Sequence, residues 1–399
     1  MNFFRRIYCR TYQFVFKILI PFLPYREPKI LSEESEVVKV LKESNKQRVL
    51  FVADKGVKNL GLTKSLEEEL SKNEIKLFIY DGTVPNPTTD NVAEALEIYK
   101  KNNCQAIIAF GGGSVLDCAK ATGALVARPK KTLGQMKGVL KVRKKIPLLI
   151  AVPTTAGTGS ETTLATVIVD SKTRHKYAIN DFPLIPSYAL LDAKLTTGLP
   201  KHITATTGMD ALTHAVEAYI GRSTTKKTRK FALDAVKLVL DNLLTAYENG
   251  KDLKARQNML IGAYKAGVAF TTSYVGYIHA IAHTIGGKYD IGHGLANAVI
   301  MPYVLKKYGK KVHKKLWKLG VYAGLFTKEV SKEEGARLFI EKIEELNEKM
   351  NIPKTLPQIK EEDIDNLAKT AEKEANPLYP VPTLYTVNDL KEIYTLIKG

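Results

Sequence analysis

The chain has 399 residues, of which 45% are hydrophobic and 25% are charged. These values are those of an ordinary globular protein and exclude an intrinsically disordered chain. The length favours two or three domains, and the patterns below argue for two. A formal net charge of +19 could attract nucleic acid, an anionic membrane or anionic ligands. Because the lysines are scattered over helix-like stretches without interleaved aromatic side chains, we expect a basic solvated surface and no nucleic-acid partner.

The three cysteines, Cys9, Cys104 and Cys118, have unrelated spacings and form no CxxC motif. No secretory signal pattern accompanies them, so the sequence predicts no disulfide framework and a cytoplasmic location.

Residues 1–31 differ in composition from the rest of the chain, because basic residues alternate there with a dense apolar set. The uninterrupted apolar runs are far below the ~20 residues that span a bilayer, and Pro21 and Pro24 end any helix early. We treat the segment as an N-terminal extension. It is expected to pack against the chain or a second subunit of a homodimer, and peripheral membrane contact is the alternative.

Residues 32–199 are predicted to form an α/β domain, since short apolar strands alternate with helix-like stretches. The expected strands cover residues 48–53, 75–80, 106–110 and 147–152, and the expected helices between them include 65–72 and 92–102. This order indicates a mostly parallel, Rossmann-like sheet covered on both faces.

A glycine run follows the third strand in the sequence GGGSVLDCAK, which contains Gly111, Gly112, Gly113, Ser114 and Asp117. Backbone N–H groups of such a loop, together with the following helix N-terminus, favour a pyrophosphate. The spacing is not GxGxxG, so a plain tight turn is the alternative.

Two other features support a dinucleotide site. Asp54 ends the first strand, where a carboxylate typically bonds a ribose hydroxyl, and this favours NAD over NADP. The fourth strand runs into PTTAGTGSE, which carries Thr154, Thr155 and Thr158. This glycine- and hydroxyl-rich loop can donate hydrogen bonds to a nucleotide without steric obstruction.

Residues 200–399 are predicted to form an all-helical domain, with helices over 231–247, 255–269 and 333–346 and a domain junction at 197–204. Asp210 and His214 lie four residues apart on one helix face, as two ligands of one ion must. Taken alone, this pair also fits an ordinary surface or core pair.

A second group of candidate ligands lies in HAIAHTIGGKYDIGHG, which contains His279, His283 and His293. The chain has only seven histidines, and four of them fall between His214 and His293. Histidines together with an aspartate suit Fe(II), Zn(II) or a similar divalent ion. The sequence therefore predicts a metal site in the helical domain.

The motifs GGGSVLDCAK, PTTAGTGSE, GMDALTHAVEAY and HAIAHTIGGKYDIGHG resemble, in order and spacing, those of the iron-containing (group III) alcohol dehydrogenases. The resemblance implies a dehydroquinate synthase-like architecture with a cofactor cleft between the domains. It further implies that Asp210, His214, His279 and His293 bind the metal and that His283 lies beside it near the substrate. The implied cofactor contacts are Asp54, Gly111, Gly112, Gly113, Ser114, Asp117, Thr154, Thr155 and Thr158, with Lys176 a weaker match.

The chain departs from the family pattern at residues 27–36. Members usually carry a short strand and a glycine turn there, whereas this chain has SEES and no glycine. The edge strand, and any oligomer built on it, are therefore left open.

The resemblance implies hydride transfer between a small primary alcohol or aldehyde and a nicotinamide, with the metal polarising the substrate oxygen. Four protein ligands fill a tetrahedral zinc, so substrate access favours Fe(II), which expands its coordination shell more readily. His283 is expected either to relay a proton or to orient a metal ligand.

Dehydroquinate synthase and glycerol dehydrogenase resemble the same framework and are the enzymatic alternatives. A synthase acting on a phosphorylated substrate would need a basic cluster near the ligands, where we find mainly Lys288. The sequence therefore favours the dehydrogenase.

Overall fold

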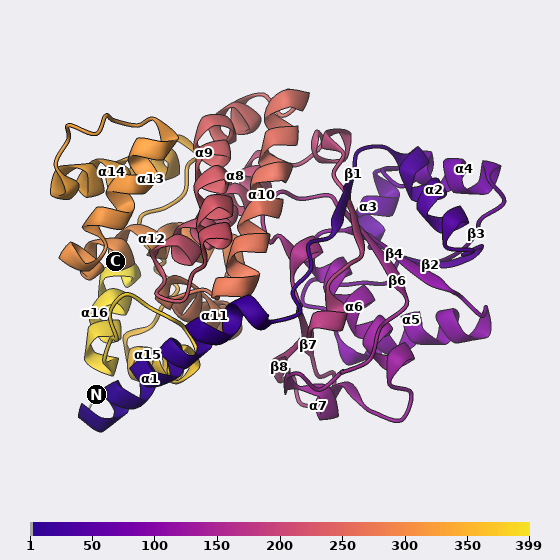
Figure 1. The fold of residues 1–399 in the computed structure, drawn as a ribbon, viewed down its shortest axis with the longest axis horizontal. Coiled ribbons are helices and arrows are strands. Elements are labelled where there is room, and N and C mark those ends of the chain that lie inside the picture. Colours follow the sequence, from indigo (N-terminus) through magenta and orange to yellow (C-terminus); the bar gives the residue numbers. More distant parts are fainter. Residues whose placement is uncertain (1–2) are drawn as a thin grey trace. The chain divides into compact units, whose positions relative to one another are not determined.

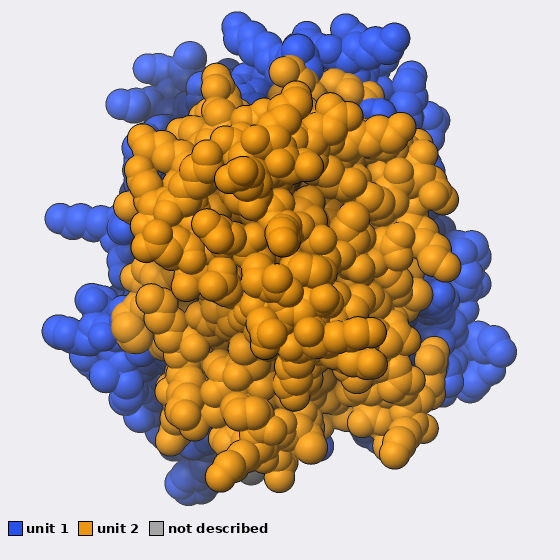
Figure 2. Space-filling model, turned by 90° about the vertical axis from the view of Figure 1, so that its right-hand side faces the viewer, with its two compact units in different colours: residues 1–23, 198–399 blue, residues 24–197 orange. Residues whose placement is uncertain are grey.

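The structure is a computed structural model that describes residues 3–399. Its chain forms two compact units (Figure 2): Pro24–Thr197, and Gly198–Gly399 together with the chain up to Leu23. The segment treated above as one extension is divided between them. Helix α1 (Phe3–Leu19) lies with the helical unit, whereas residues 24–31 lie with the α/β unit. The first two residues of the extension lie outside the described residues.

The α/β unit is built on a six-stranded parallel sheet (Figure 1). Its strands, in spatial order, are β1 (Lys29–Leu31), β9 (Tyr188–Leu190), β6 (Leu148–Pro153), β4 (Ala106–Gly111), β2 (Arg48–Val52) and β3 (Lys76–Tyr80). The four predicted strands are thereby confirmed to within one residue. The edge strand left open by the sequence is present as β1, which pairs with β9.

Helices cover both faces of this sheet, which is why its central strands are continuous apolar runs. Successive residues of a strand point to opposite faces. Leu50 and Ile107 therefore join one core cluster with α5 (Thr89–Lys101) and α6 (Gly113–Ala127). Phe51 and Ile108 join the other cluster with α2 (Glu34–Glu43) and α4 (Lys64–Lys72).

The strand order reverses between β2 and β4. The chain passes from β2 to its outer neighbour β3, then crosses to β4 on the other side of β2 and continues to β6. In such sheets, ligands bind outside the carboxyl ends of the strands at this switch point. Asp54 follows the carboxyl end of β2 by two residues, and Gly111 is the last residue of β4; both are predicted cofactor contacts.

A second, three-stranded sheet was not predicted from the sequence. It orders β5 (Gly138–Val139), β8 (Lys176–Asn180) and β7 (Ala165–Val169), and β7 and β8 pair antiparallel.

The second unit is helical, as predicted. Besides α1 it contains α8 (Lys201–Ile220), α9 (Lys226–Glu248), α10 (Leu253–Ser273), α11 (Tyr277–Tyr289), α12 (His293–Tyr308), α13 (His313–Ala323), α14 (Lys332–Lys349), α15 (Ile364–Ala375) and α16 (Val387–Lys398). Helix α8 is its centre, since every residue from Gly208 to Ile220 is buried. Within residues 3–399, no helix combines the length and apolar composition needed to cross a membrane.

Candidate functional site

Helix α8 supplies the first two candidate metal ligands. Asp210 and His214 lie one helical turn apart and are both buried, and Asp210 Oδ1 is 4.0 Å from His214 Nδ1. The ring of Phe270 from α10 stacks on His214, with 4.1 Å between the ring centroids. A buried carboxylate beside imidazoles is costly unless charges are paired or a cation is bound. The pair therefore belongs to a larger polar group.

Helices α11 and α12 bring the other two candidates to α8. His279 lies in the first turn of α11, and His293 is the first residue of α12. Gly294 allows the close approach, because a Cβ at this position would lie 2.3 Å from the backbone oxygen of Thr206 on α8. A larger residue at position 294 would push His293 away from Asp210.

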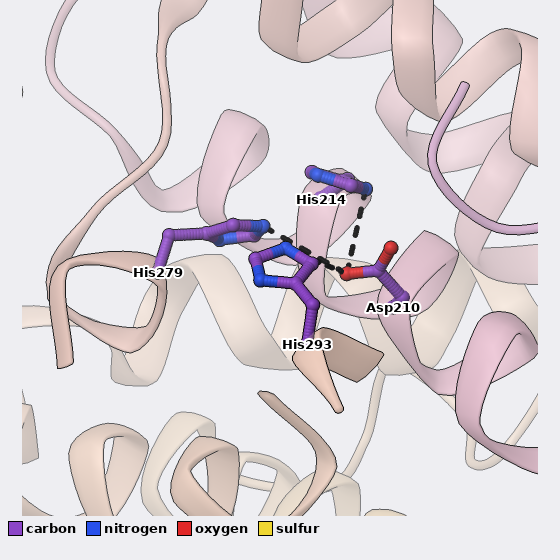
Figure 3. A group of neighbouring side chains, drawn as sticks. All are labelled: Asp210, His214, His279 and His293. Carbon is purple, nitrogen blue, oxygen red and sulfur yellow. Dashed lines mark ion pairs between the residues drawn. The ribbon is translucent and has the colours of Figure 1, made fainter. Parts of the chain in front are cut away.

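The four side chains form one cluster (Figure 3). One donor atom from each of Asp210, His214, His279 and His293 lies within 4.8 Å of every other. Asp210 Oδ1 is 3.5 Å from His293 Nε2 and 3.9 Å from His279 Nε2. Donors about 2.1 Å from a tetrahedral ion would be about 3.4 Å apart, so a small contraction around a cation suffices. One carboxylate and three imidazoles fit a divalent transition metal.

Glu217, which the sequence analysis missed, orients His279. It lies on α8 seven residues after Asp210, and its carboxylate accepts hydrogen bonds from His279 Nδ1 at 2.7 Å and from the backbone N–H groups of Gly276 and Ile278, both at 2.8 Å. Burial raises the pKa of Glu217 to about 7, although the backbone hydrogen bonds oppose that shift. With Nδ1 held by Glu217, Nε2 of His279 faces the cluster, as expected of a metal ligand with a carboxylate behind it.

Asn297 was also missed. It follows His293 by one turn of α12, and its Nδ2 is 2.8 Å from Asp210 Oδ1, 3.2 Å from His293 Nε2 and 3.3 Å from His279 Nε2. A hydrogen bond from this amide to Asp210 fixes one carboxylate oxygen. Glu217 follows Asp210 by seven residues and Asn297 follows His293 by four, so each shares a helix face with a candidate ligand. These spacings are the signals by which the sequence could have indicated both residues.

The cluster is buried on one side and open on the other. The side chain of His279 is 2% exposed, whereas those of His293 and His283 are 39% and 43% exposed. The rings of His283 and His293 stack with 5.2 Å between their centroids. A substrate would therefore reach the cluster past these two histidines.

Glu374 holds His283 in place. Its Oε1 lies 2.6 Å from His283 Nδ1 and also accepts a hydrogen bond from the Tyr379 hydroxyl at 2.8 Å. Burial alone would raise the pKa of Glu374, but His283 and Tyr379 outweigh it, so this pKa lies below its usual range. The sequence analysis missed Glu374, because 91 residues separate it from its partner.

In the α/β unit, the two predicted nucleotide loops lie side by side. Both follow neighbouring strands, β4 and β6, and the backbone N–H of Thr154 donates to the oxygen of Gly111 at 3.1 Å. A Cβ built on Gly112 would lie 3.7 Å from Thr155, and one on Gly113 would lie 3.0 Å from Thr158.

The other predicted cofactor residues have identifiable places. Asp54 caps α3 (Lys55–Asn59), since its Oδ1 accepts from the backbone N–H of Val57 at 2.9 Å. Ser114 lies in the first turn of α6, and Lys176 begins β8, where its Nζ donates to Asn86 at 2.7 Å. Burial raises the pKa of Asp117 to about 6, although Lys120 and Lys176 act against that shift.

Lys120 anchors the loop after β6. This fully buried lysine donates to backbone and side-chain oxygens of Ser160 and Thr163 and to the oxygen of Ala165, at 2.6–3.1 Å. A buried ammonium is tolerated only when it is hydrogen-bonded in this way. Lys120 therefore ties α6 to the loop that carries Thr154–Thr158.

Two family profiles match the chain in succession. The profile described as iron-containing alcohol dehydrogenase matches residues 28–193, and that described as the C-terminal part of the Fe-containing alcohol dehydrogenase family matches residues 204–397. Together they cover both units.

Individual proteins match over nearly their whole length. A 1,3-propanediol dehydrogenase of Citrobacter freundii is 36% identical over 91% of this chain and 94% of its own. An NAD-dependent methanol dehydrogenase of Bacillus methanolicus is 35% identical over 90% and 94%, respectively. The solved structure of an alcohol dehydrogenase from Oenococcus oeni superposes with a TM-score of 0.89 at 31% identity, covering 94% of this chain and 100% of that one.

Proposed function

Because the chain belongs to the iron-containing alcohol dehydrogenase family, we propose that it interconverts a small primary alcohol and its aldehyde with NAD(H) and Fe(II). The observation that carries the proposal is the cluster of one carboxylate and three imidazoles, which is buried except on the side of His293 and His283. Relatives named for 1,3-propanediol and methanol support a small alcohol as the substrate.

Purified protein should therefore oxidise NADH when a short aliphatic aldehyde is added, and reduce NAD with the corresponding alcohol. The reaction is followed by the absorbance of the reduced cofactor. Binding of NADH without turnover of any short aldehyde or alcohol would contradict the proposed substrate class.

We propose that Asp210, His214, His279 and His293 hold the metal. When bound, a divalent ion there would act as a Lewis acid on the substrate oxygen. Four protein ligands leave a tetrahedral ion no open position, so Fe(II), which expands its shell more readily than Zn(II), is the proposed ion. Glu217 and Asn297 would fix the orientation of the ligands, because they form hydrogen bonds with His279 and Asp210, respectively.

The variant Glu217→Gln is expected to lower metal affinity by about 10- to 100-fold, because His279 loses the carboxylate that orients its ring. Affinity is measured by competition with a chelator of known strength, and Glu248→Gln, an exposed position at the end of α9, is the control. Unchanged affinity in Glu217→Gln would show that the hydrogen bond does not support the metal.

We propose that the glycine loop binds the pyrophosphate of NAD(H). Gly112 has φ −77°, which any residue can adopt, and a Cβ there meets nothing closer than 3.7 Å. Nothing within the chain therefore requires glycine at position 112, whereas a ligand close to the backbone would.

Gly112→Ala should change the free energy of unfolding by less than about 1 kcal/mol and weaken NADH binding by about tenfold or more. Both are measured on the same preparation, by thermal unfolding and by fluorescence titration. The control is Gly134→Ala, at a glycine in α7 (Leu133–Met136) outside both loops. Equal NADH affinity in all three proteins would remove the loop from the cofactor site.

Asp54 is proposed to select NAD over NADP by repelling the additional phosphate of NADP. Because asparagine caps helices as well as aspartate, Asp54→Asn removes the charge and keeps the cap of α3. We expect the ratio of kcat/KM for NADPH to that for NADH to rise about tenfold or more, which is about 1.4 kcal/mol. Asp192→Asn, at another capping aspartate, should leave the ratio unchanged; a rise there, or none at Asp54, would contradict the proposal.

The predicted homodimer remains a proposal, as do the cofactor roles of Ser114, Asp117, Thr154, Thr155, Thr158 and Lys176. For the two loops, the support is their adjacency at the carboxyl ends of β4 and β6.

A further inference from the structure

Helix α1 and the turn that follows it (Ile20–Phe22) leave most of their large apolar side chains exposed. Their buried residues are Cys9, Gln13 and Ile20. Gln13 Nε2 donates to the backbone oxygen of Tyr379 at 2.7 Å, and Arg10 donates to the backbone oxygens of Val381 and Pro382 at 2.8 and 3.1 Å. These directed contacts fix which side of the helix faces outward.

The outward side is a concentrated apolar surface. Of the 19 large hydrophobic residues that are exposed in residues 3–399, ten lie in residues 3–22. We call these ten the α1 apolar face: Phe3, Phe4, Ile7, Tyr8, Tyr12, Phe14, Val15, Ile18, Leu19 and Phe22. A concentrated patch of exposed apolar side chains on a protein surface marks an interaction site.

The helical positions separate apolar from basic residues. At about 100° per residue, the face occupies about half of the helix circumference and contains no charged residue. Arg6 and Lys17, both exposed, border it on one side. On the other side Tyr8 and Tyr12 are followed by Arg5, whose charge is paired with Glu372 at 2.6 Å. The helix has no acidic residue at all.

Further basic residues lie beside the basic border. Arg222, Arg229 and Lys17 are close enough to Lys315 to add to the effect of burial, which lowers the pKa of Lys315 to about 8. Arg222 likewise adds to the lowering that burial causes in the pKa of Arg10, to about 10. Positive charge therefore accumulates on one edge of the apolar face.

We propose that residues 3–22 dock the protein on the surface of an anionic lipid bilayer, with the α1 apolar face in the headgroup region and Arg6 and Lys17 at the lipid phosphates. An amphipathic helix with basic flanks and aromatic residues lies in the plane of the bilayer surface in this way. In a second copy the helix would offer Arg6 and Lys17 no acidic residue to pair with, whereas lipid phosphates would pair with both. The family profile begins at residue 28, so the surface is a property of this chain beyond the family match.

The test is co-sedimentation of the full chain with vesicles of phosphatidylcholine alone or of equimolar phosphatidylcholine and phosphatidylglycerol, at low and high salt. The wild type should bind the anionic vesicles at low salt. High salt should reduce this binding, and vesicles of phosphatidylcholine alone should bind less protein. No binding to anionic vesicles at low salt would overturn the proposal.

Two double variants separate the contributions. Phe14→Ser with Ile18→Ser should reduce binding about tenfold or more by removing apolar contacts, and Arg6→Gln with Lys17→Gln should reduce binding to anionic vesicles by a similar factor. Leu60→Ser, at a leucine that is 71% exposed in the α/β unit, is the control and should bind as the wild type does. Equal binding by all variants, or equal loss in the control, would contradict the proposal.

Because the replaced side chains are exposed, each variant is expected to fold as the wild type does. Thermal unfolding checks this for every variant. The molar mass without lipid decides between the bilayer and a second copy. A mass unchanged by Phe14→Ser with Ile18→Ser supports the bilayer, whereas conversion of a dimer to a monomer would assign the face to a second copy.

Discussion

Replacing His279 with alanine is expected to abolish metal binding and to lower kcat/KM for the reduction of a short aldehyde by NADH about a thousandfold. His279 is the most deeply buried candidate ligand, and burial together with the neighbouring imidazoles holds its pKa well below the usual range of a histidine. It therefore presents the neutral ring that metal coordination needs. Without the metal, the variant should lose about 4 kcal/mol of transition-state stabilisation. This loss corresponds to a fall of about a thousandfold in kcat/KM.

The matched control is His202→Ala, at an exposed histidine near the start of the same helix that carries Asp210. It should keep full metal content and activity. Because His279→Ala leaves the buried Glu217 without its imidazole partner, Asp210→Asn is a second variant that keeps the shape of the side chain. Stoichiometric metal or wild-type kcat/KM in both ligand variants would contradict the site.

Replacing His283 with alanine is expected to lower kcat by about 100-fold or more while metal content stays at the wild-type level. His283 lies at the open side of the cluster, and its Nδ1 is 2.6 Å from the carboxylate of Glu374. A proton on Nδ1 held there makes Nε2 the atom that would exchange a proton with the substrate oxygen. This arrangement favours the proton relay over the orienting role, which the sequence left as alternatives.

Metal content separates the relay from the alternative orienting role. If His283 only positions the neighbouring His293 ring, the alanine variant loses metal affinity, and added metal restores most of its kcat. A variant that keeps its metal and its turnover would exclude the relay. Glu374→Gln, which weakens the contact to His283 without removing the ring, should lower kcat by a smaller factor with metal content unchanged.

The sequence was sufficient to predict the central strands and the candidate ligands. Strands such as β4 are buried along their whole length. They therefore appear in the sequence as unbroken apolar runs, which can be recognised without knowledge of the elements that pack against them. Histidine is rare in this chain, so three histidines within fifteen residues were informative without any knowledge of the fold. The distances between the four candidate ligands could not be predicted, because they depend on the contact between α8 and α12, which are far apart in the sequence.

Residues that act through long-range partners could not be identified from the sequence. Glu217 is one of many glutamates, and its partners on and before α11 lie 59 to 62 residues away. Lys120 would be expected on the surface. It is buried because the loop after β6 supplies four oxygens around its ammonium and Ala165, at the start of β7, supplies a fifth. The basic and apolar composition of α1 was visible, but which side of the helix faces outward depends on backbone oxygens near Tyr379 and Val381.

The proposed activity requires that Asp210, His214, His279 and His293 hold one catalytic divalent ion. Anaerobic NADH oxidation with a short aliphatic aldehyde tests this claim, using metal-stripped protein supplied with Fe(II), with Zn(II) or with neither. We predict no activity without metal, the highest activity with Fe(II) at one ion per chain, and no recovery in His279→Ala. Full activity in the stripped protein, or equal recovery in His279→Ala, would contradict the claim.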